Sequence, residues 1–131
     1  MILEIKNFGQ LEIQNLVLDM NGTIACDGKL IPGILDRINT LKHSLKIFLI
    51  SADTFGTANE IANYLGISLF KLNPSQIESD QKEAFVESLN AKNTIAFGNG
   101  RNDIKMLKKA RIGIGIIGSE GMAAEVLANA T

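Results

Sequence analysis

The residues best suited to chemistry in this chain are carboxylates, amides and one lysine that stand beside short apolar runs. Asp19 directly follows the apolar run 16–18 and precedes a turn signal at Asn21 and Gly22. This order predicts a buried strand that carries a carboxylate to its C-terminal end, where open α/β sheets bind ligands. A buried carboxylate is costly without a cation, so Asp19 is a candidate nucleophile or metal ligand. Taken alone, the string also fits a capped strand-to-loop turn.

Two further polar clusters follow apolar runs in the same way. Ser51 follows the run 46–50, and the segment 98–103 (Gly-Asn-Gly-Arg-Asn-Asp) follows the run 94–97. Because parallel strands end at one edge of a sheet, we expect Asp19, Ser51 and the polar residues of 98–103 to converge on one pocket. The general polarity of loops explains any one cluster, but it explains three less well.

Lys82 is the cation that we expect to meet Asp19. It stands three, four and seven residues before Phe85, Val86 and Leu89, so it falls on the buried face of a predicted helix. Lysine is rarely buried unless it is paired. The alternative is a surface lysine whose stem lies along apolar side chains.

The elements that must position these residues alternate between strand and helix. Strands are expected at 2–5, 11–14, 16–19, 46–50, 67–72, 94–97 and 112–117. The first expected helix runs from Pro32 to about residue 45, and the second ends at about residue 65 and has Phe55 on its apolar face. The third begins near a capping box of Asp80 with Glu83, the fourth ends at residue 110, and the fifth covers 121–128.

This alternation predicts an α/β fold, namely a three-layer, doubly wound, mostly parallel and Rossmann-like sheet. The chain is expected to form one domain, 1–131. Its residues 1–14 are expected to form an N-terminal β-hairpin that extends one edge of the sheet, and residues 15–131 the core.

The amino-acid composition and net charge limit the binding partners and the cellular compartment that we expect for this protein. The chain has 131 residues, 46% of them hydrophobic, and a formal net charge of −1, which gives no global field to recruit nucleic acid. Its single cysteine, Cys26, cannot form an internal disulfide, which suits a reducing compartment. No apolar run reaches the length of a membrane span. We therefore expect a soluble, cytoplasmic protein with neither a nucleic-acid nor a membrane partner.

The polar clusters, taken together, resemble a known set of motifs. Asp19-Met20-Asn21-Gly22-Thr23, then Ser51, then Lys82, then the segment 98–103 resemble the four ordered motifs of the haloacid dehalogenase-like superfamily. Within it, they look most like the small soluble proteins related to the P-domain of P-type ATPases. The likeness runs from about Leu16 to Ala128.

The resemblance implies a role for each motif residue. Asp19 would attack a phosphorylated substrate and become an aspartyl phosphate, in a catalytic set of Asp19, Asn21, Ser51 and Lys82. Phosphate would be bound by Gly22, Thr23, Ser51, Ala52, Lys82 and Asn102. Mg²⁺ would be held by Asp19, the backbone carbonyl of Asn21, Asn99 and Asp103. Phosphoryl transfer depends mainly on positioning and charge stabilisation, which this set can supply.

Two residues depart from the phosphatase pattern. Asn21 replaces an aspartate that acts as general acid and base, and losing such a group typically costs about 10²–10⁴ in rate. Asn99 replaces a metal-binding aspartate, although Mg²⁺ usually needs only one or two carboxylates. We therefore expect weak metal binding and slow turnover.

Two functions from different classes remain open. The first is a Mg²⁺-dependent phosphohydrolase of low activity, and the second is a non-catalytic regulatory or binding module that keeps the phosphate site. A two-component receiver domain is disfavoured because its phosphorylated aspartate should end the third strand of the sheet.

The intervals between motifs leave no room for a cap domain. An uncapped site suits a large substrate or a site covered by a neighbouring subunit of a homo-oligomer. The resemblance also implies a further strand beyond Thr131, without which a sheet edge would lack a partner. The basic residues Arg101, Lys105 and Lys108 could steer an anionic substrate, or could form an ordinary solvated helix face.

Overall fold

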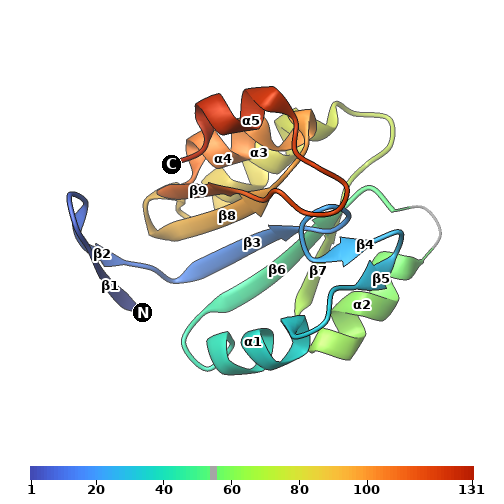
Figure 1. Ribbon diagram of the computed structural model, residues 1–131, viewed down its shortest axis with the longest axis horizontal. Coiled ribbons are helices and arrows are strands. Elements are labelled where there is room, and N and C mark those ends of the chain that lie inside the picture. The colour runs from blue at the N-terminus through green and yellow to red at the C-terminus, as the bar shows by residue number, and fades with distance from the viewer. Residues whose placement is uncertain (54–55) are drawn as a thin grey trace.

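The centre of the structure is a five-stranded parallel sheet (Figure 1). The structure is a computed structural model that describes residues 1–53 and 56–131. The strands lie in the order β7-β6-β3-β8-β9, and each neighbouring pair is parallel. Their bounds are β3 Asn15–Asp19, β6 Lys46–Ser51, β7 Ser68–Lys71, β8 Thr94–Gly98 and β9 Ile112–Gly115. The order places β3, the strand that ends in Asp19, at the middle of the sheet.

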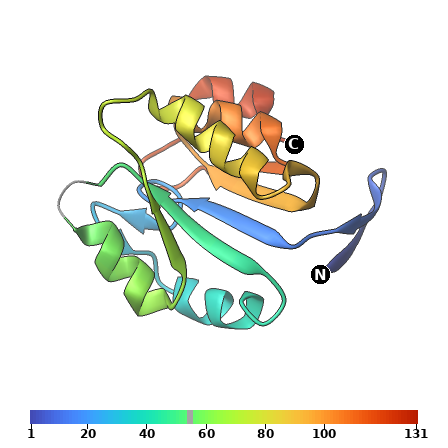
Figure 2. The ribbon, with the colours of Figure 1, turned by 180° about the vertical axis from the view of Figure 1, so that it is seen from behind.

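Helices cover both faces of this sheet, as the sequence predicts (Figures 1 and 2). One face carries α1 (Ile34–Leu41) and α2 (Thr57–Leu65), and the other carries α3 (Glu78–Ser88), α4 (Ile104–Lys109) and α5 (Ala124–Asn129). Successive side chains of a strand point to opposite faces, so Leu16 and Leu18 join one core cluster while Val17 joins the other. The three-layer, doubly wound architecture is therefore confirmed.

The N-terminal hairpin stands apart from the main sheet. It consists of β1 (Ile2–Ile5) and β2 (Gly9–Glu12), which form a separate two-stranded sheet that projects from the body of the molecule (Figure 1). The expectation that it extends an edge of the sheet is wrong. Its chain runs through the fully buried Ile13 directly into the central strand β3, so the hairpin emerges at the middle of the sheet.

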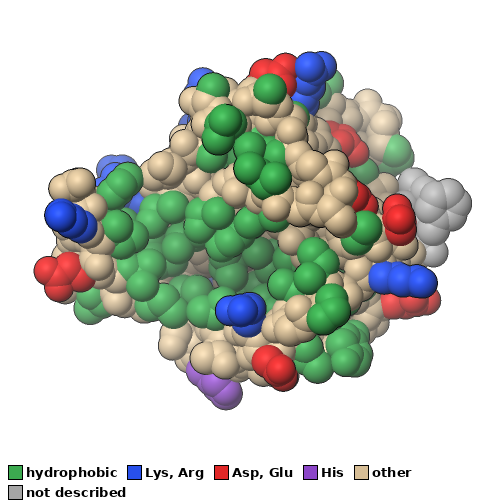
Figure 3. Space-filling model, in the orientation of Figure 1, with side chains coloured by type: hydrophobic (Ala, Val, Ile, Leu, Met, Phe, Trp, Pro, Cys, Tyr) green, Lys and Arg blue, Asp and Glu red, His purple; other side chains and the backbone are tan. Residues whose placement is uncertain are grey.

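An apolar hollow opens between this hairpin and the main sheet (Figure 3). Half-buried side chains from both parts, including Leu3, Ile5, Phe97 and Ile114, pack against the larger core cluster. The hollow lies toward the N-terminal ends of the strands, away from the edge at which Asp19 ends β3 (Figures 1 and 3).

Several element boundaries differ from those expected. The loop that contains Asp27 and Gly28 is a short hairpin of β4 (Ala25–Cys26) and β5 (Lys29–Leu30). Helix α3 begins at Glu78 without a side-chain cap, so the capping box proposed at Asp80 is wrong. Strand β9 ends two residues early, and α5 begins at Ala124 rather than near residue 121. Phe55 lies outside the described residues. No helix within those residues combines the length and apolar composition needed to span a lipid bilayer.

Candidate active site

The register of the sheet brings the three polar clusters to one level. Asp19 pairs with Ile50 of β6, so Ser51 stands one residue beyond it. On the other side, Leu18 pairs with Phe97 of β8, which places Gly98 opposite Asp19 and starts the segment 98–103 at the same edge. Segments 30 to 80 residues apart in sequence thus end side by side because their strands are parallel and in register.

A buried lysine joins two of these segments. Lys82 Nζ lies 2.8 Å from Asp19 Oδ1 and 2.7 Å from Asp103 Oδ1, and the residue is only 1% exposed. It projects from the second turn of α3, four residues before the fully buried Val86 on the same helix face. The structure therefore brings Lys82 and Asp19 together, as the sequence predicts, and adds Asp103 as a second partner.

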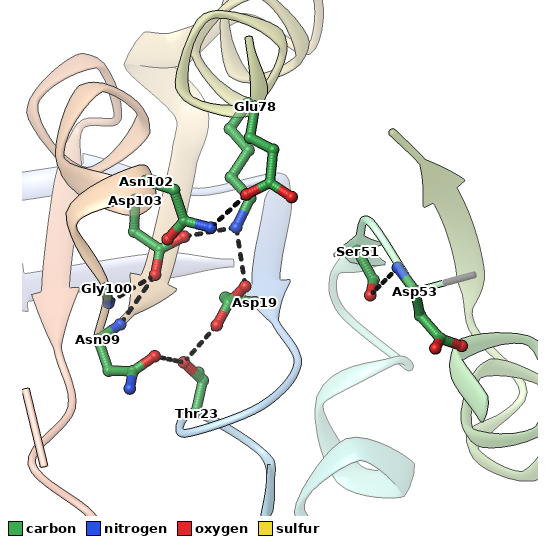
Figure 4. Close-up of polar contacts among 10 residues, drawn as sticks. Asp19, Thr23, Ser51, Asp53, Glu78, Asn99, Gly100, Asn102 and Asp103 are labelled. Atoms are coloured by element: carbon green, nitrogen blue, oxygen red, sulfur yellow. Dashed lines mark hydrogen bonds and ion pairs between the residues drawn. The ribbon is translucent and has the colours of Figure 1, made fainter. Parts of the chain in front are cut away.

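The Asp103 side chain is buried and hydrogen-bonded to the protein through both oxygens. The residue is 0% exposed; its Oδ1 accepts from Lys82, and its Oδ2 accepts from the backbone N–H groups of Asn99 and Gly100 at 3.0 and 2.9 Å. This arrangement differs from the direct metal-ligand role that we expected for Asp103. Both oxygens already have partners, so Asp103 acts on the site by holding Lys82 and the 98–103 turn (Figure 4).

Burial controls the ionisation of this triad. Burial raises the pKa of Asp19 to about 6, against the opposing attraction of the Lys82 ammonium and with a smaller rise from the Asp103 carboxylate. Burial alone would lower the pKa of Lys82, but the two carboxylates outweigh it, and the net pKa is raised. Lys82 is therefore a permanent cation, whereas Asp19 can be protonated in mildly acidic solution.

A tight turn after β3 brings the Thr23 hydroxyl close to the second carboxylate oxygen of Asp19. The Thr23 hydroxyl lies 3.2 Å from Asp19 Oδ2 and 3.5 Å from Asn99 Oδ1 (Figure 4). Gly22 has a φ of +80°, and a Cβ at this position would lie only 2.0 Å from Asn99 Nδ2. Glycine is thus required both by the backbone conformation and by the close approach of the Asn99 amide.

Ser51 and Asp53 form the wall that faces this triad across the pocket (Figure 4). Ser51 Oγ accepts a hydrogen bond from the Asp53 N–H at 3.0 Å, which leaves the hydroxyl proton available for a substrate oxygen. Asp53 Oδ2 accepts from the N–H of Ala58 at 2.8 Å, in the first turn of α2. Asp53 thus accepts from one of the N–H groups that have no intrahelical partner at the start of α2.

Asn21 is held by the β4–β5 hairpin. Its Oδ1 accepts a hydrogen bond from the Gly28 N–H at 3.1 Å, and its side chain also lines the pocket. Asp27 and Gly28 both have positive φ, as a two-residue hairpin turn requires. The Asp-Gly pair was the signal that could have predicted this hairpin.

Glu78 is a pocket residue that the sequence reasoning missed. Asn102, which we expected to bind phosphate, donates from Nδ2 to Glu78 Oε2 at 2.7 Å (Figure 4). Glu78 is the first residue of α3 and stands four positions before Lys82, so both lie on one helix face. The spacing of four residues from Lys82 was the sequence signal that could have placed Glu78 in the pocket.

These residues surround an open pocket of about 400 Å³. Its lining residues are Asp19, Met20, Asn21, Ser51, Ala52, Asp53, Glu78, Lys82, Asn99 and Asn102. All the expected site residues therefore line the pocket or support it from behind. Gly22 and Thr23 shape the turn beneath Asp19, and Asp103 lies behind Lys82.

The oxygen donors in this pocket fit a hard divalent cation. The Asp19 carboxylate, the Asn99 amide oxygen and the backbone carbonyl of Asn21 belong to neighbouring segments at one edge, and Mg²⁺ prefers such oxygen ligands. Thr23 lies within hydrogen-bonding distance of both the Asp19 and the Asn99 oxygens, which shows that these two donors face the same space. Asp103 is 0% exposed, and both of its oxygens are hydrogen-bonded to the protein.

Comparison with known sequences gives short local matches. An uncharacterized protein of Methanocaldococcus jannaschii is 49% identical over 39 residues, which cover 30% of this chain and 89% of that protein. The phospholipid-transporting ATPase dnf2 of Schizosaccharomyces pombe is 42% identical over 59 residues, which cover 45% of this chain and only 4% of the ATPase. The chain is therefore similar to a small part of such ATPases.

Comparison with solved structures gives the same fold. The 3-deoxy-D-manno-octulosonate 8-phosphate phosphatase from Moraxella catarrhalis, solved with magnesium, phosphate and a sugar-acid molecule, superposes with a TM-score of 0.68 at 18% identity. The superposition covers 90% of this chain and 74% of that one. At this identity the likeness concerns the fold alone.

A family model covers most of the chain. The model of the haloacid dehalogenase-like hydrolases matches residues 7–111, a range that includes β3, the Lys82 helix and the segment 98–103. The matched range, the parallel sheet and the residues that converge at its edge lead to one assignment: the chain belongs to the haloacid dehalogenase-like hydrolase family.

Proposed function

We propose that this protein is a metal-dependent phosphohydrolase of low activity in which Asp19 attacks phosphorus and becomes an aspartyl phosphate. The observation that carries the proposal is the Asp19–Lys82–Asp103 triad at the end of the central strand, open to a pocket on the Asp19 side only. Membership of a hydrolase family supports it.

The first step would transfer the phosphoryl group to the protein. A bond forms between an Asp19 oxygen and phosphorus, and the bond between phosphorus and the leaving-group oxygen breaks. Lys82 stabilises the added negative charge, and the Ser51 hydroxyl donates a hydrogen bond to a phosphoryl oxygen. A bound Mg²⁺, held by Asp19, Asn99 and the carbonyl of Asn21, would neutralise phosphoryl charge.

The second step would release phosphate when water attacks the aspartyl phosphate. Both steps move a proton, first to the leaving group and then from the water. Asn21 stands near the Asp19 turn but has an amide, which cannot exchange a proton at neutral pH. Asn21 therefore supplies neither proton transfer, and we infer that the phosphoenzyme is long-lived.

Asn21 and Asn99 also support a second candidate, a phosphate-binding module without turnover. Both functions keep the same pocket, so the formation of a covalent intermediate separates them. Wild type and Asp19→Asn should be exposed to radiolabelled acetyl phosphate with Mg²⁺ and quenched in acid. We expect label on wild type alone, in an alkali-labile linkage. If folded wild type takes no label and hydrolyses no phosphate ester, the binding module is the better assignment.

A further inference from the structure

Glu78 contributes a carboxylate to the pocket, on the more exposed side of Asp19 and Lys82. Helix α3 begins at Glu78, and Lys82, one turn later, pairs with Asp19. Both residues line the pocket, and Glu78 is half-buried whereas Lys82 is 1% exposed, so Glu78 lies nearer the solvent. Figure 4 shows Glu78 above Asp19, across the pocket from Ser51 and Asp53.

The Glu78 charge is oriented but not neutralised. Asn102 Nδ2 donates to Oε2 at 2.7 Å, and Glu78 forms no ion pair with any residue in the ranges 1–53 and 56–131. The neutral amide of Asn102 fixes the direction of the carboxylate without cancelling its charge. Of the described residues that line the pocket, Lys82 is the only cation, and it is already held between two carboxylates.

Two basic residues near this end of the molecule, Arg101 and Lys105, are already paired with carboxylates. Arg101 pairs with Glu125 at 2.8 Å, and Lys105 pairs with Asp80. These contacts favour the solvated, ion-paired helix face over the steering of anionic substrates. Among the described pocket-lining residues, the charged group that the leaving group of a bound phosphate ester would meet is therefore the Glu78 carboxylate, since the Asp53 carboxylate is engaged by the Ala58 N–H at the start of α2.

We propose that Glu78 selects the leaving group: the pocket favours phosphate monoesters whose leaving group carries a hydrogen-bond donor or a positive charge close to phosphorus, and disfavours those with a second anionic group. The proposal rests on the proposed phosphohydrolase function and adds a substrate class to it. A cationic group would pair with Glu78, whereas a carboxylate or a second phosphate would be repelled by it.

Three two-carbon phosphate esters test this selection at nearly constant size. Phosphoethanolamine carries an ammonium group, 2-hydroxyethyl phosphate is neutral beyond its phosphate, and phosphoglycolate carries a carboxylate. Wild type should show kcat/KM values that fall in this order. In Glu78→Gln the ratio of phosphoethanolamine to phosphoglycolate should fall about tenfold, because the neutral amide neither attracts the ammonium group nor repels the carboxylate.

Asp80→Asn provides the matched control. It removes the same unit charge two residues further along α3, from an exposed side chain that pairs with Lys105 and does not line the pocket. Its substrate ratio should stay within twofold of wild type. A fall of at least fivefold in Glu78→Gln, with Asp80→Asn unchanged, supports the proposal. A smaller fall, or an equal fall in both variants, overturns it.

Binding gives a second readout that separates this proposal from the proposed function. The same three esters are titrated into wild type and Glu78→Gln with Mg²⁺, and the shift in melting temperature is recorded. If no ester is hydrolysed but wild type is stabilised most by phosphoethanolamine, and the preference disappears in Glu78→Gln, the selection holds while phosphohydrolysis fails. If the esters stabilise both proteins equally or not at all, the selection is overturned.

Discussion

Lys82 Nζ lies 2.7 Å from Asp103 Oδ1, and both side chains are almost completely removed from solvent. Asp103 in turn accepts two backbone N–H groups of the 98–103 segment, so the lysine that faces the nucleophile is fixed to a rigid turn. This contact makes Lys82 both a reactive-site cation and part of the core. Its removal should therefore affect stability as well as chemistry.

Lys82→Met should unfold more easily than wild type by about 3–5 kcal/mol, because it leaves Asp19 and Asp103 as buried carboxylates without a cation. Urea denaturation measures this cost. The double variant Lys82→Met/Asp103→Asn should regain much of the stability but no phosphohydrolase activity. A Lys82→Met protein within about 1 kcal/mol of wild type would show that the pair is not a structural one.

Asp19 should make the stability of the metal-free protein depend on pH. Burial raises its pKa from 3.8 to about 6, so folded protein binds a proton that unfolded protein releases between those values. The stability that protonated Asp19 provides is complete below pH 4 and is lost as the pH rises through 6.

Comparison with Asp19→Asn isolates this effect. In the presence of EDTA, the variant should gain about 2–3 kcal/mol relative to wild type between pH 4 and pH 7, as the shift of about two pKa units implies. Urea denaturation at a series of pH values measures the difference. A difference between the two proteins that does not change with pH would contradict the raised pKa.

Asn21→Asp should speed the hydrolysis of the aspartyl phosphate. An aspartate in this position can keep the hydrogen bond from the Gly28 N–H and also accept a proton from the attacking water. The gain should be at most about 10²–10⁴-fold. Acid-quench decay of labelled phosphoenzyme measures it, with Asn21→Ala as the control that has neither an amide nor a carboxylate. Equal decay in wild type and Asn21→Asp would show that the amide does not limit this site.

Gly22→Ala should destabilise the protein more than Gly33→Ala. The two glycines have similar positive φ values, +80° and +86°, but a Cβ at Gly33 meets no atom within 4 Å, whereas one at Gly22 meets the Asn99 amide at 2.0 Å. Gly33→Ala should cost about 1–2 kcal/mol for its backbone conformation alone. Gly22→Ala should cost more and should also weaken Mg²⁺ binding, because Asn99 must move. Equal costs in thermal denaturation would argue against the close approach.

Asn99→Asp should bind Mg²⁺ about tenfold more tightly, because a carboxylate is a stronger ligand for this ion than an amide oxygen. The variant loses the hydrogen bond from Asn99 Nδ2 to the Gly121 carbonyl, so its metal-free form should be slightly less stable. Isothermal titration measures the affinity. Asn102→Asp adds the same charge to the pocket at a residue that we do not propose as a ligand; an equal gain in both variants would indicate a general charge effect.

The fold class and most of the residues of the site were predictable from the amino-acid sequence. Apolar runs that end in Asp19, Ser51 and Gly98 predicted parallel strands with a polar edge, because parallel strands are buried on both faces and place their carboxyl ends together. Helical spacing from Val86 also predicted that Lys82 is buried, since positions four apart share one face.

The partner of each polar group depends on packing in the folded chain and could not be predicted from the sequence. Sequence spacing defines the face on which a side chain lies, but not the neighbour that packing brings to it. Thus Asp103 binds Lys82 and two backbone N–H groups, and Glu78 accepts a hydrogen bond from Asn102. The position of the N-terminal hairpin could not be predicted either. It lies outside the main sheet because it precedes β3, and the place of β3 at the middle of the sheet is defined only in the folded chain.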